Sequence, residues 1–166
     1  MAAPPYTHPP RALLIGLISD THGLLRPEVH DAFAGAGLIL HAGDGGGDEI
    51  LDELAIIAPV KAVTGNTDAP GNHRLATSIS LQAGGLRIHV SHGHELGVPK
   101  PDTLLARYDA DVIIYGHTHI PRIERAGPRL VVNPGAAGPA RFEFAPSVAL
   151  LTIADGVAAA RIIALH

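Results

Sequence analysis

The feature that most constrains this chain is a series of short apolar runs that each stop abruptly in polar residues and a glycine. The first run has the length and composition of a buried strand, and it ends in Ser19-Asp20-Thr21-His22-Gly23. Comparable runs occupy residues 12–18, 38–40, 60–63, 86–90 and 112–115. The sequence therefore predicts several buried strands with polar groups at their carboxyl ends.

Helical segments separate the first three runs. Pro27 lies in the first turn of a helix expected over residues 27–36, a position that favours proline. Residues 49–58 carry apolar side chains at helical spacing, and Asp48 is expected to cap this helix. The alternation of strand and helix predicts a parallel sheet with right-handed crossover connections.

The second half of the chain contains more predicted strands than helices. Strands are expected at residues 79–81, 86–90, 112–115, 130–132, 148–153 and 157–165, and a helix at 102–108. The first two form a predicted hairpin across Ala83-Gly84-Gly85. The last two flank Asp155-Gly156, a pair that supplies the positive φ angles of a tight hairpin turn.

Length and composition predict one globular domain. The chain has 166 residues, of which 46% are hydrophobic and 17% charged, so it can bury a substantial core and is not expected to be disordered. Residues 1–10 are rich in proline and are interpreted as a flexible tail. Residues 11–166 are interpreted as a single domain without a linker or an internal repeat.

Charge and residue usage argue against several functions. The formal net charge is −4 and no run of lysine and arginine exists, which disfavours binding to extended nucleic acid. Cysteine is absent, which excludes disulfides and thiolate metal sites. No apolar stretch approaches the length of a membrane span or a signal peptide, so a cytoplasmic protein without a membrane partner is expected.

Groups that can ligate a divalent cation follow five of the apolar runs. They are Asp20-Thr21-His22, Gly43-Asp44, Gly65-Asn66, His92-Gly93-His94 and Gly116-His117-Thr118-His119. Ligands of open α/β sheets bind at the carboxyl ends of the strands, and glycine lets the backbone turn sharply beside a ligand. The repetition predicts a metal site of nitrogen and oxygen donors, which suit Mn²⁺, iron, Ni²⁺ or Zn²⁺.

The order of these motifs, D-x-H, G-D, G-N, H-G and G-H-x-H, resembles that of the calcineurin-like metallophosphoesterase superfamily. The resemblance runs from Ile15 to about Gly135, and it is closest to the small prokaryotic phosphodiesterases, which are similar in fold to a eukaryotic retromer scaffold subunit. It implies an α/β fold in which two mixed β-sheets form a sandwich flanked by helices, in four layers.

The resemblance also implies two divalent metal ions, with manganese the first expectation and iron, nickel or zinc the alternatives. One ion would be held by Asp20, His22, Asp44 and His119. Asp44 would bridge to the second ion, which Asn66, His92 and His117 would complete. Two ions about 3.5–4 Å apart can share a deprotonated water that attacks a phosphoryl group in line.

One departure from the family pattern leaves the proton donor for the leaving group open. Many members have a histidine after the G-N motif, whereas this chain has Thr67 and then Asp68. Two residues are candidate catalytic acids, His94 and Asp68. The alternatives are a plain loop histidine and a turn-forming aspartate. His41 is similarly interpreted either as a residue that orients a ligand or as a buried histidine bonded to the backbone.

These observations predict a metal-dependent hydrolase of small phosphodiesters with an open site and broad specificity. The alternatives among enzymes are a phosphomonoesterase and a dinucleoside polyphosphate hydrolase. The alternative from another class is a non-catalytic scaffold, which has no need of a full ligand set. A homo-oligomer is expected from fold analogy alone.

Overall fold

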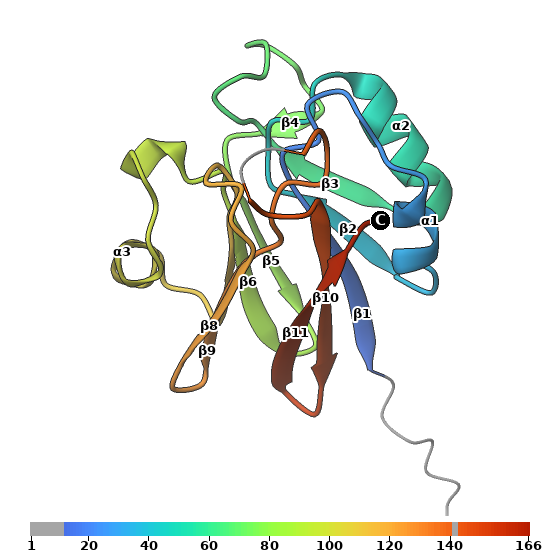
Figure 1. Ribbon diagram of the computed structural model, residues 1–166. Coiled ribbons are helices and arrows are strands. Elements are labelled where there is room, and N and C mark those ends of the chain that lie inside the picture. The colour runs from blue at the N-terminus through green and yellow to red at the C-terminus, as the bar shows by residue number, and fades with distance from the viewer. Residues whose placement is uncertain (1–11, 141–142) are drawn as a thin grey trace, which may run out of the picture.

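Two β-sheets packed face to face make up the centre of the molecule (Figure 1). The structure, a computed structural model, describes residues 12–140 and 143–166. The proline-rich segment 1–10 lies outside the described residues. In the part of the chain that is described, no helix is long and apolar enough to cross a membrane.

The first sheet has six strands in the order β11-β10-β1-β2-β3-β4. They are β1 (Leu13–Ile18), β2 (Leu38–His41), β3 (Val60–Val63), β4 (Leu75–Ala76), β10 (Ser147–Ala154) and β11 (Val157–Ala164). β1, β2, β3 and β4 run parallel to one another, whereas β10 pairs antiparallel with both β1 and β11. The predicted parallel unit and the predicted C-terminal hairpin therefore share one mixed sheet.

The second sheet has five strands in the order β5-β6-β7-β9-β8. They are β5 (Ile79–Ala83), β6 (Leu86–Val90), β7 (Val112–Ile114), β8 (Arg122–Ala126) and β9 (Arg129–Asn133). β6, β7 and β9 are parallel, and β5 and β8 close the two edges in antiparallel pairing.

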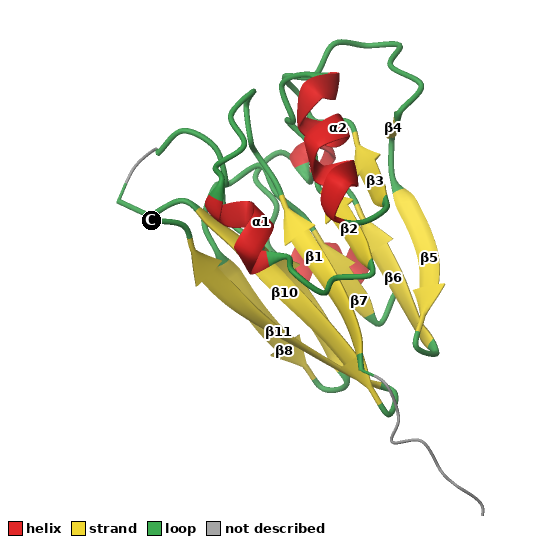
Figure 2. Ribbon diagram, turned by 90° about the vertical axis from the view of Figure 1, so that its right-hand side faces the viewer, coloured by secondary structure: helices red, strands yellow, loops and turns green. Residues whose placement is uncertain are grey.

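Helices cover the outer faces of both sheets, which gives four layers (Figure 2). α1 (Glu28–Ala32) and α2 (Asp48–Ile57) lie on the first sheet, and α3 (Pro101–Arg107) lies on the second. Central strands are thus buried on both sides, which explains why they are continuous apolar runs in the sequence. The prediction of an α/β sandwich of two mixed sheets flanked by helices is confirmed.

Alternate residues of the central strands fill two different cores. Leu17 and Leu40 point between the sheets, whereas Ile18 and Ile39 pack under α1 and α2. Gly16 faces Phe33, and a Cβ at this position would lie 2.9 Å from the buried ring. Glycine at the centre of β1 is therefore required by close packing.

Some local predictions were wrong. α1 ends at Ala32, four residues before the predicted end. Asp48 does not cap α2, because the N-cap is Gly47; the Asp48 carboxylate instead accepts a hydrogen bond from the Asn72 amide. The two edge strands β4 and β8 were not predicted. β8 has the sequence RIERA, whose exposed charged residues suit an edge strand and hide the strand pattern.

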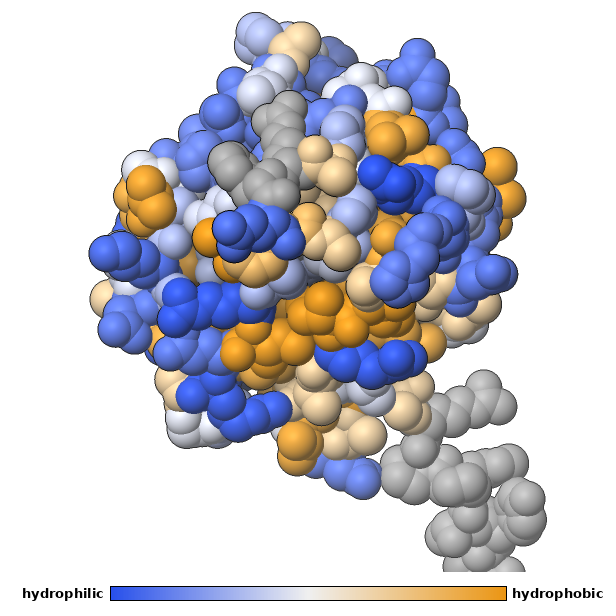
Figure 3. Space-filling view, viewed as in Figure 1, coloured by the Kyte–Doolittle hydropathy of each residue, from blue (hydrophilic) through white to orange (hydrophobic). Residues whose placement is uncertain are grey.

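The edges of the two sheets meet at β8 and β11. Arg125 of β8 donates a hydrogen bond to the carbonyl of Ala158 in β11. Ile123 and Val157 are exposed on these strands, and Figure 3 shows apolar surface over this side of the molecule. The predicted ligand motifs lie at the end of the sandwich where the parallel strands reach their carboxyl ends.

Candidate metal centre

The carboxyl ends of β1, β2, β3, β6 and β7 bring all seven predicted metal ligands to one end of the sandwich. The first three strands belong to one sheet and the other two to its partner sheet. Ligand atoms of two groups lie within 4.8 Å of one another, namely Asp20 with His22 and His119, and Asp20 with Asp44 and His92. Asp20 is shared by both groups.

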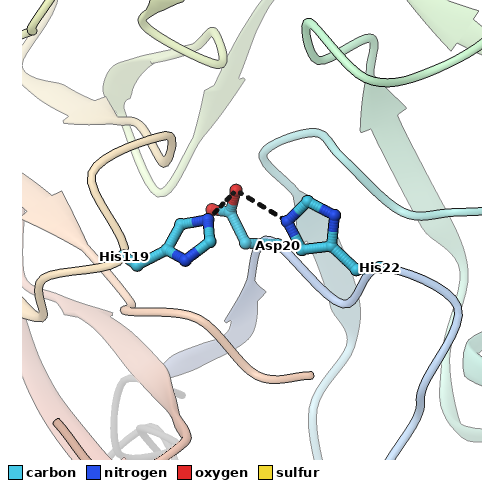
Figure 4. Close-up of side chains that lie close together, drawn as sticks. All are labelled: Asp20, His22 and His119. Atoms are coloured by element: carbon cyan, nitrogen blue, oxygen red, sulfur yellow. Dashed lines mark ion pairs between the residues drawn. The ribbon is translucent and has the colours of Figure 1, made fainter. Parts of the chain in front are cut away.

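The first group surrounds the Asp20 carboxylate (Figure 4). His119 Nε2 lies 3.1 Å from Asp20 Oδ1, and His22 Nε2 lies 3.7 Å from the same oxygen. The two imidazoles approach from opposite sides, because His22 follows β1 and His119 follows β7. The site thus joins loops that are about a hundred residues apart in the sequence.

The second group centres on His92. Its Nε2 lies 3.1 Å from Asp44 Oδ2 and 3.0 Å from Asn66 Oδ1. His117 Nδ1 approaches the same Asn66 oxygen at 3.1 Å. His92 Nε2 also lies 3.9 Å from Asp20 Oδ1, so the two groups adjoin at Asp20.

The tautomer of His92 follows from its surroundings. Nδ1 lies 2.7 Å from the carbonyl oxygen of Ala42, and because a carbonyl only accepts, this nitrogen carries a proton. Nε2 then faces Asp44 and Asn66. Burial alone lowers the pKa of His92, but the carboxylates of Asp44 and Asp20 outweigh burial and raise the pKa above its ordinary value. The two carboxylates near His92 Nε2 therefore stabilise a positive charge there, either a proton or a metal ion.

Each carboxylate uses one oxygen for the protein scaffold and turns the other toward the imidazoles. Asp20 Oδ2 accepts hydrogen bonds from Ser19 Oγ and from the backbone N–H of His117, while Asp20 Oδ1 is buried without a hydrogen-bond partner. Asp44 Oδ1 accepts from the N–H of Thr67, and Asp44 Oδ2 faces His92. An oxygen left in this state fits a cation, so the donor set fits divalent metal ions.

The pKa values of both carboxyl groups agree with this arrangement. Burial raises the pKa of Asp20, but His119, His22 and His92 together hold it well below the usual range. For Asp44, burial is likewise outweighed, by the hydrogen bonds from His92 and the Thr67 N–H, and the pKa falls to about 2. Both groups are therefore ionised at neutral pH, as metal ligation requires.

Five of the seven predicted ligands have a left-handed backbone conformation. They are Asp20, His22, Asp44, His117 and His119, with φ between 45° and 71°. Among the described non-glycine residues, the one other case is Asp155 in the hairpin turn. This conformation costs about 1–2 kcal/mol per residue and persists where the surroundings enforce it. Here the N–H groups of Asp20 and His22 donate to the carbonyls of Gly43 and Asp44, which locks two ligand loops together.

The glycines beside the ligands have two different roles. Gly43 has a φ of 103°, in agreement with the predicted sharp turn. Gly65 and Gly116 do not have positive φ; a Cβ on Gly65 would overlap Asp44 Oδ1, and one on Gly116 would overlap Ser19 Oγ. The absence of a side chain at Gly65 makes room for the Asp44 carboxylate, and its absence at Gly116 makes room for the Ser19 hydroxyl that donates to Asp20.

His41 supports the loops without pointing at the ligands. Its Nδ1 accepts a hydrogen bond from the Gly43 N–H, so Nε2 carries the proton and donates to Thr21 Oγ1. The Thr21 hydroxyl in turn donates to the carbonyl of Gly45. Of the two alternatives for His41, bonding to the backbone is what the contacts show, and the bonds it makes also position the loop that carries Asp44.

The two candidate acids have different surroundings. Asp68 accepts hydrogen bonds from the backbone N–H groups of Asp44 and Gly65 at 2.9 and 2.7 Å, so its carboxylate ties two ligand loops together. These contacts favour the turn-forming role over the acid role, because both hydrogen bonds hold the carboxylate on the backbone of the ligand loops. His94 begins a short 3₁₀-helix, and its ring centroid lies 5.3 Å from that of His92 and 6.2 Å from that of His117.

Sequence reasoning did not assign two residues that support the site. Ser19 donates to Asp20 Oδ2 at 2.6 Å, and the Asn133 amide donates to the carbonyl of Gly116 and to Thr118 Oγ1. Both are completely buried. A polar residue at the last position of an apolar run was the available signal for Ser19 and for Asn133.

Comparisons with known proteins agree with the geometry. The calcineurin-like phosphoesterase superfamily domain matches residues 13–156. A probable metallophosphoesterase of Methanothermobacter thermautotrophicus is 41% identical over 154 residues, which cover 87% of each chain. A phosphodiesterase of Methanocaldococcus jannaschii is 29% identical over 139 residues, covering 73% of this chain and 82% of the relative. Vacuolar protein sorting 29 of Cryptosporidium parvum has a similar fold, with a TM-score of 0.78, 23% identity and coverage of 93% and 98%.

Proposed function

The chain belongs to the calcineurin-like phosphoesterase superfamily, and we propose on that premise that it hydrolyses small phosphodiesters at a dinuclear metal centre. Phosphoester hydrolysis is the activity class of the family and of its named relatives. The observation that carries the proposal is the convergence of all seven donor side chains, with the buried Asp20 Oδ1 facing the imidazoles of His119, His22 and His92.

The proposed ligand assignment follows the family pattern, with Asp44 as the shared carboxylate, whereas Asp20 is the residue common to the two groups in the structure. Asp20, His22, Asp44 and His119 hold one ion, and Asp44, Asn66, His92 and His117 hold the other. Two divalent ions held by these residues, for which Mn²⁺ is proposed, would supply a hydroxide nucleophile from bound water and would polarise the phosphoryl oxygens. The donor set does not discriminate among Mn²⁺, iron, Ni²⁺ and Zn²⁺.

The side chains that would surround a bound phosphate are assigned as metal ligands, so they are not proposed as general acids or bases. His92 Nδ1 donates a hydrogen bond to the carbonyl of Ala42, which fixes the ring, and we assign His92 as a ligand and not as a base. Two divalent ions, the two carboxylates and a hydroxide leave one positive charge, which a phosphodiester monoanion neutralises. This balance favours a diester over a more highly charged monoester dianion or polyphosphate.

We propose His94 as the group that protonates the leaving oxygen. Its ring is half-buried beside His92 and His117, and its Nδ1 makes no hydrogen bond. Asp68, the other candidate, already accepts two short backbone hydrogen bonds. The scaffold alternative is disfavoured because a scaffold needs no complete ligand set.

The test is the initial rate on bis(p-nitrophenyl) phosphate, measured on metal-stripped protein with and without added Mn²⁺. We expect metal-dependent turnover that Asp44→Asn lowers by at least about 100-fold, since even residues that only orient ligands contribute 10–100-fold. Asp155→Asn is the matched control, because Asp155 has the same chemistry and a φ of 53° but lies in a distant hairpin turn.

The same assay separates the remaining alternatives. His94→Gln should slow a diester with an alkyl leaving group about 100-fold and a p-nitrophenyl diester much less, because a good leaving group needs no proton. Faster hydrolysis of p-nitrophenyl phosphate than of the diester would establish the phosphomonoesterase instead. No turnover with Mn²⁺, Fe²⁺, Ni²⁺ or Zn²⁺ would contradict the enzymatic proposal.

A further inference from the structure

A cavity of about 670 Å³ adjoins the metal centre on the side of Asn66 and His94. Its walls are formed mainly by the segment between β3 and β5, with His94 closing one side. Ligand pockets commonly have volumes of about 300–1,000 Å³, so this space is large enough for an organic group of substantial size. The segment runs along the top of Figure 1, above β4.

The cavity shares one lining residue, Asn66, with the space in which the ligands converge. A smaller hollow of about 280 Å³ is lined by His22, Asp44, His117 and His119, and Asn66 lines both spaces. The two spaces therefore adjoin at Asn66, so an ester substituent of a phosphoryl group bound in the smaller hollow would have the larger cavity within reach.

The wall of the cavity offers hydrogen bonds and two imidazoles, those of His73 and His94, but no lysine or arginine among its described residues. Thr64, Thr77, Asn66 and His94 supply hydroxyl, amide and imidazole groups. None of the described residues that line either space is a lysine or an arginine. A second phosphate in this cavity would meet imidazoles but, among the described side chains, no lysine or arginine to neutralise it.

Arg74, which follows the lining residue His73, forms ion pairs with α2. Its Nη1 lies 2.8 Å from Asp52 Oδ1 and 3.8 Å from Asp48 Oδ2. Asp68, the acidic residue of the wall, accepts its hydrogen bonds from the backbone. Its negative charge adds to the cost of placing another anion there.

We infer that this cavity binds an uncharged organic ester group of the phosphodiester, of the size and hydrogen-bonding character of a nucleoside. The inference rests on the proposed function and makes it narrower. It selects substrates in which a single phosphate joins two alcohols, and it excludes the dinucleoside polyphosphates, whose further phosphates would have to enter the same space.

The test compares two diesters, thymidylyl-thymidine and methyl p-nitrophenyl phosphate, with Thr77→Tyr and Ser78→Tyr. Thr77 lines the cavity and is exposed, whereas its neighbour Ser78 does not line it. We expect Thr77→Tyr to lower kcat/KM for thymidylyl-thymidine by about tenfold or more and that for the small diester by less than about twofold. Ser78→Tyr, the matched control, should change neither value.

The outcomes separate this inference from the proposed function. Equal losses on both diesters, or no loss on thymidylyl-thymidine, would overturn the inference while the small diester still reports the enzyme. A dinucleoside diphosphate hydrolysed with a kcat/KM equal to that of thymidylyl-thymidine would also overturn it. If the wild-type protein hydrolyses neither diester with any of the four metals, the proposed function fails and the inference fails with it.

Discussion

His41 is the residue whose burial has the clearest measurable consequence. It is completely buried with both ring nitrogens in hydrogen bonds, and burial lowers its pKa to about 4. The unfolded chain has an ordinary histidine pKa near 6.5. Between these two pH values His41 is protonated in the unfolded state but not in the folded state. The free energy of unfolding therefore decreases as the pH falls through this range.

We expect His41→Asn to remove this part of the pH dependence. The shorter amide side chain would still offer an acceptor to Gly43, and the variant should lose less stability than the wild type between about pH 6.5 and pH 4, by up to about 3 kcal/mol. Urea unfolding of the metal-free proteins at several pH values measures the difference. At about pH 8, where His41 is neutral in both states, only the lost hydrogen bond to Thr21 should separate the two proteins. Parallel stability curves across the whole range would contradict the neutral, buried state of His41.

At the scale of elements, the end of α3 depends on a single side chain from another element. Arg129 of β9 donates hydrogen bonds to the carbonyls of Leu105, Tyr108 and Ala110, at 3.1, 2.6 and 2.9 Å. The last carbonyls of a helix have no partner within the helix, so an outside donor is needed. The forked guanidinium thus fastens α3 and the following turn to the second sheet.

Arg129→Ala should lower the free energy of unfolding by about 2 kcal/mol, as expected for hydrogen bonds from a charged donor. Arg129→Lys should fall between the wild type and the alanine variant, because an ammonium cannot reproduce the fork. Arg122→Ala is the control: Arg122 is exposed and pairs with Glu124 on the same strand, so its loss should stay within about 0.5 kcal/mol. Equal effects of the two alanine variants in urea unfolding would refute the bracing role of Arg129.

At the scale of the whole molecule, the proposed metal ligands come from both sheets. Asp20, Asp44 and Asn66 follow strands of the first sheet, while His92 and His119 follow strands of the second. Elsewhere the sheets meet mainly through apolar side chains such as Leu17, Leu40 and Ile114. Metal ions bound at this end would therefore join the two sheets.

Metal binding should then stabilise the fold as a whole. Mn²⁺ at about 100 times its dissociation constant should add about 2.7 kcal/mol and raise Tm by about 5–10 °C. Differential scanning calorimetry of the metal-stripped protein with and without Mn²⁺ measures this, and Asp44→Asn should show a smaller increase. Mn²⁺ binding detected by titration calorimetry without any change in Tm would contradict a site that spans both sheets.

The fold class and the convergence of the proposed ligands could be predicted from the sequence because both leave a local pattern in it. Strands buried on both faces must be apolar along most of their length, so β1, β2 and β7 were predicted close to their observed bounds. Ligand types at the ends of successive strands are also local features, and parallel strands carry their ends to one edge. The seven residues from Asp20 to His119 followed from this pattern and the family resemblance.

The tertiary structure alone decided which groups support the ligands and what surrounds them. Edge strands such as β8 bury little and carry charged residues, so they leave no apolar pattern to detect. The contacts of Asp68 with Asp44, of Gly116 with Ser19 and of His117 with Asp20 join residues from different strands. A sequence records the burial of each strand face but not its partners across the molecule. The role of Asp68, the space beside Gly65 and the cavity next to Asn66 exist only once the two sheets are packed together.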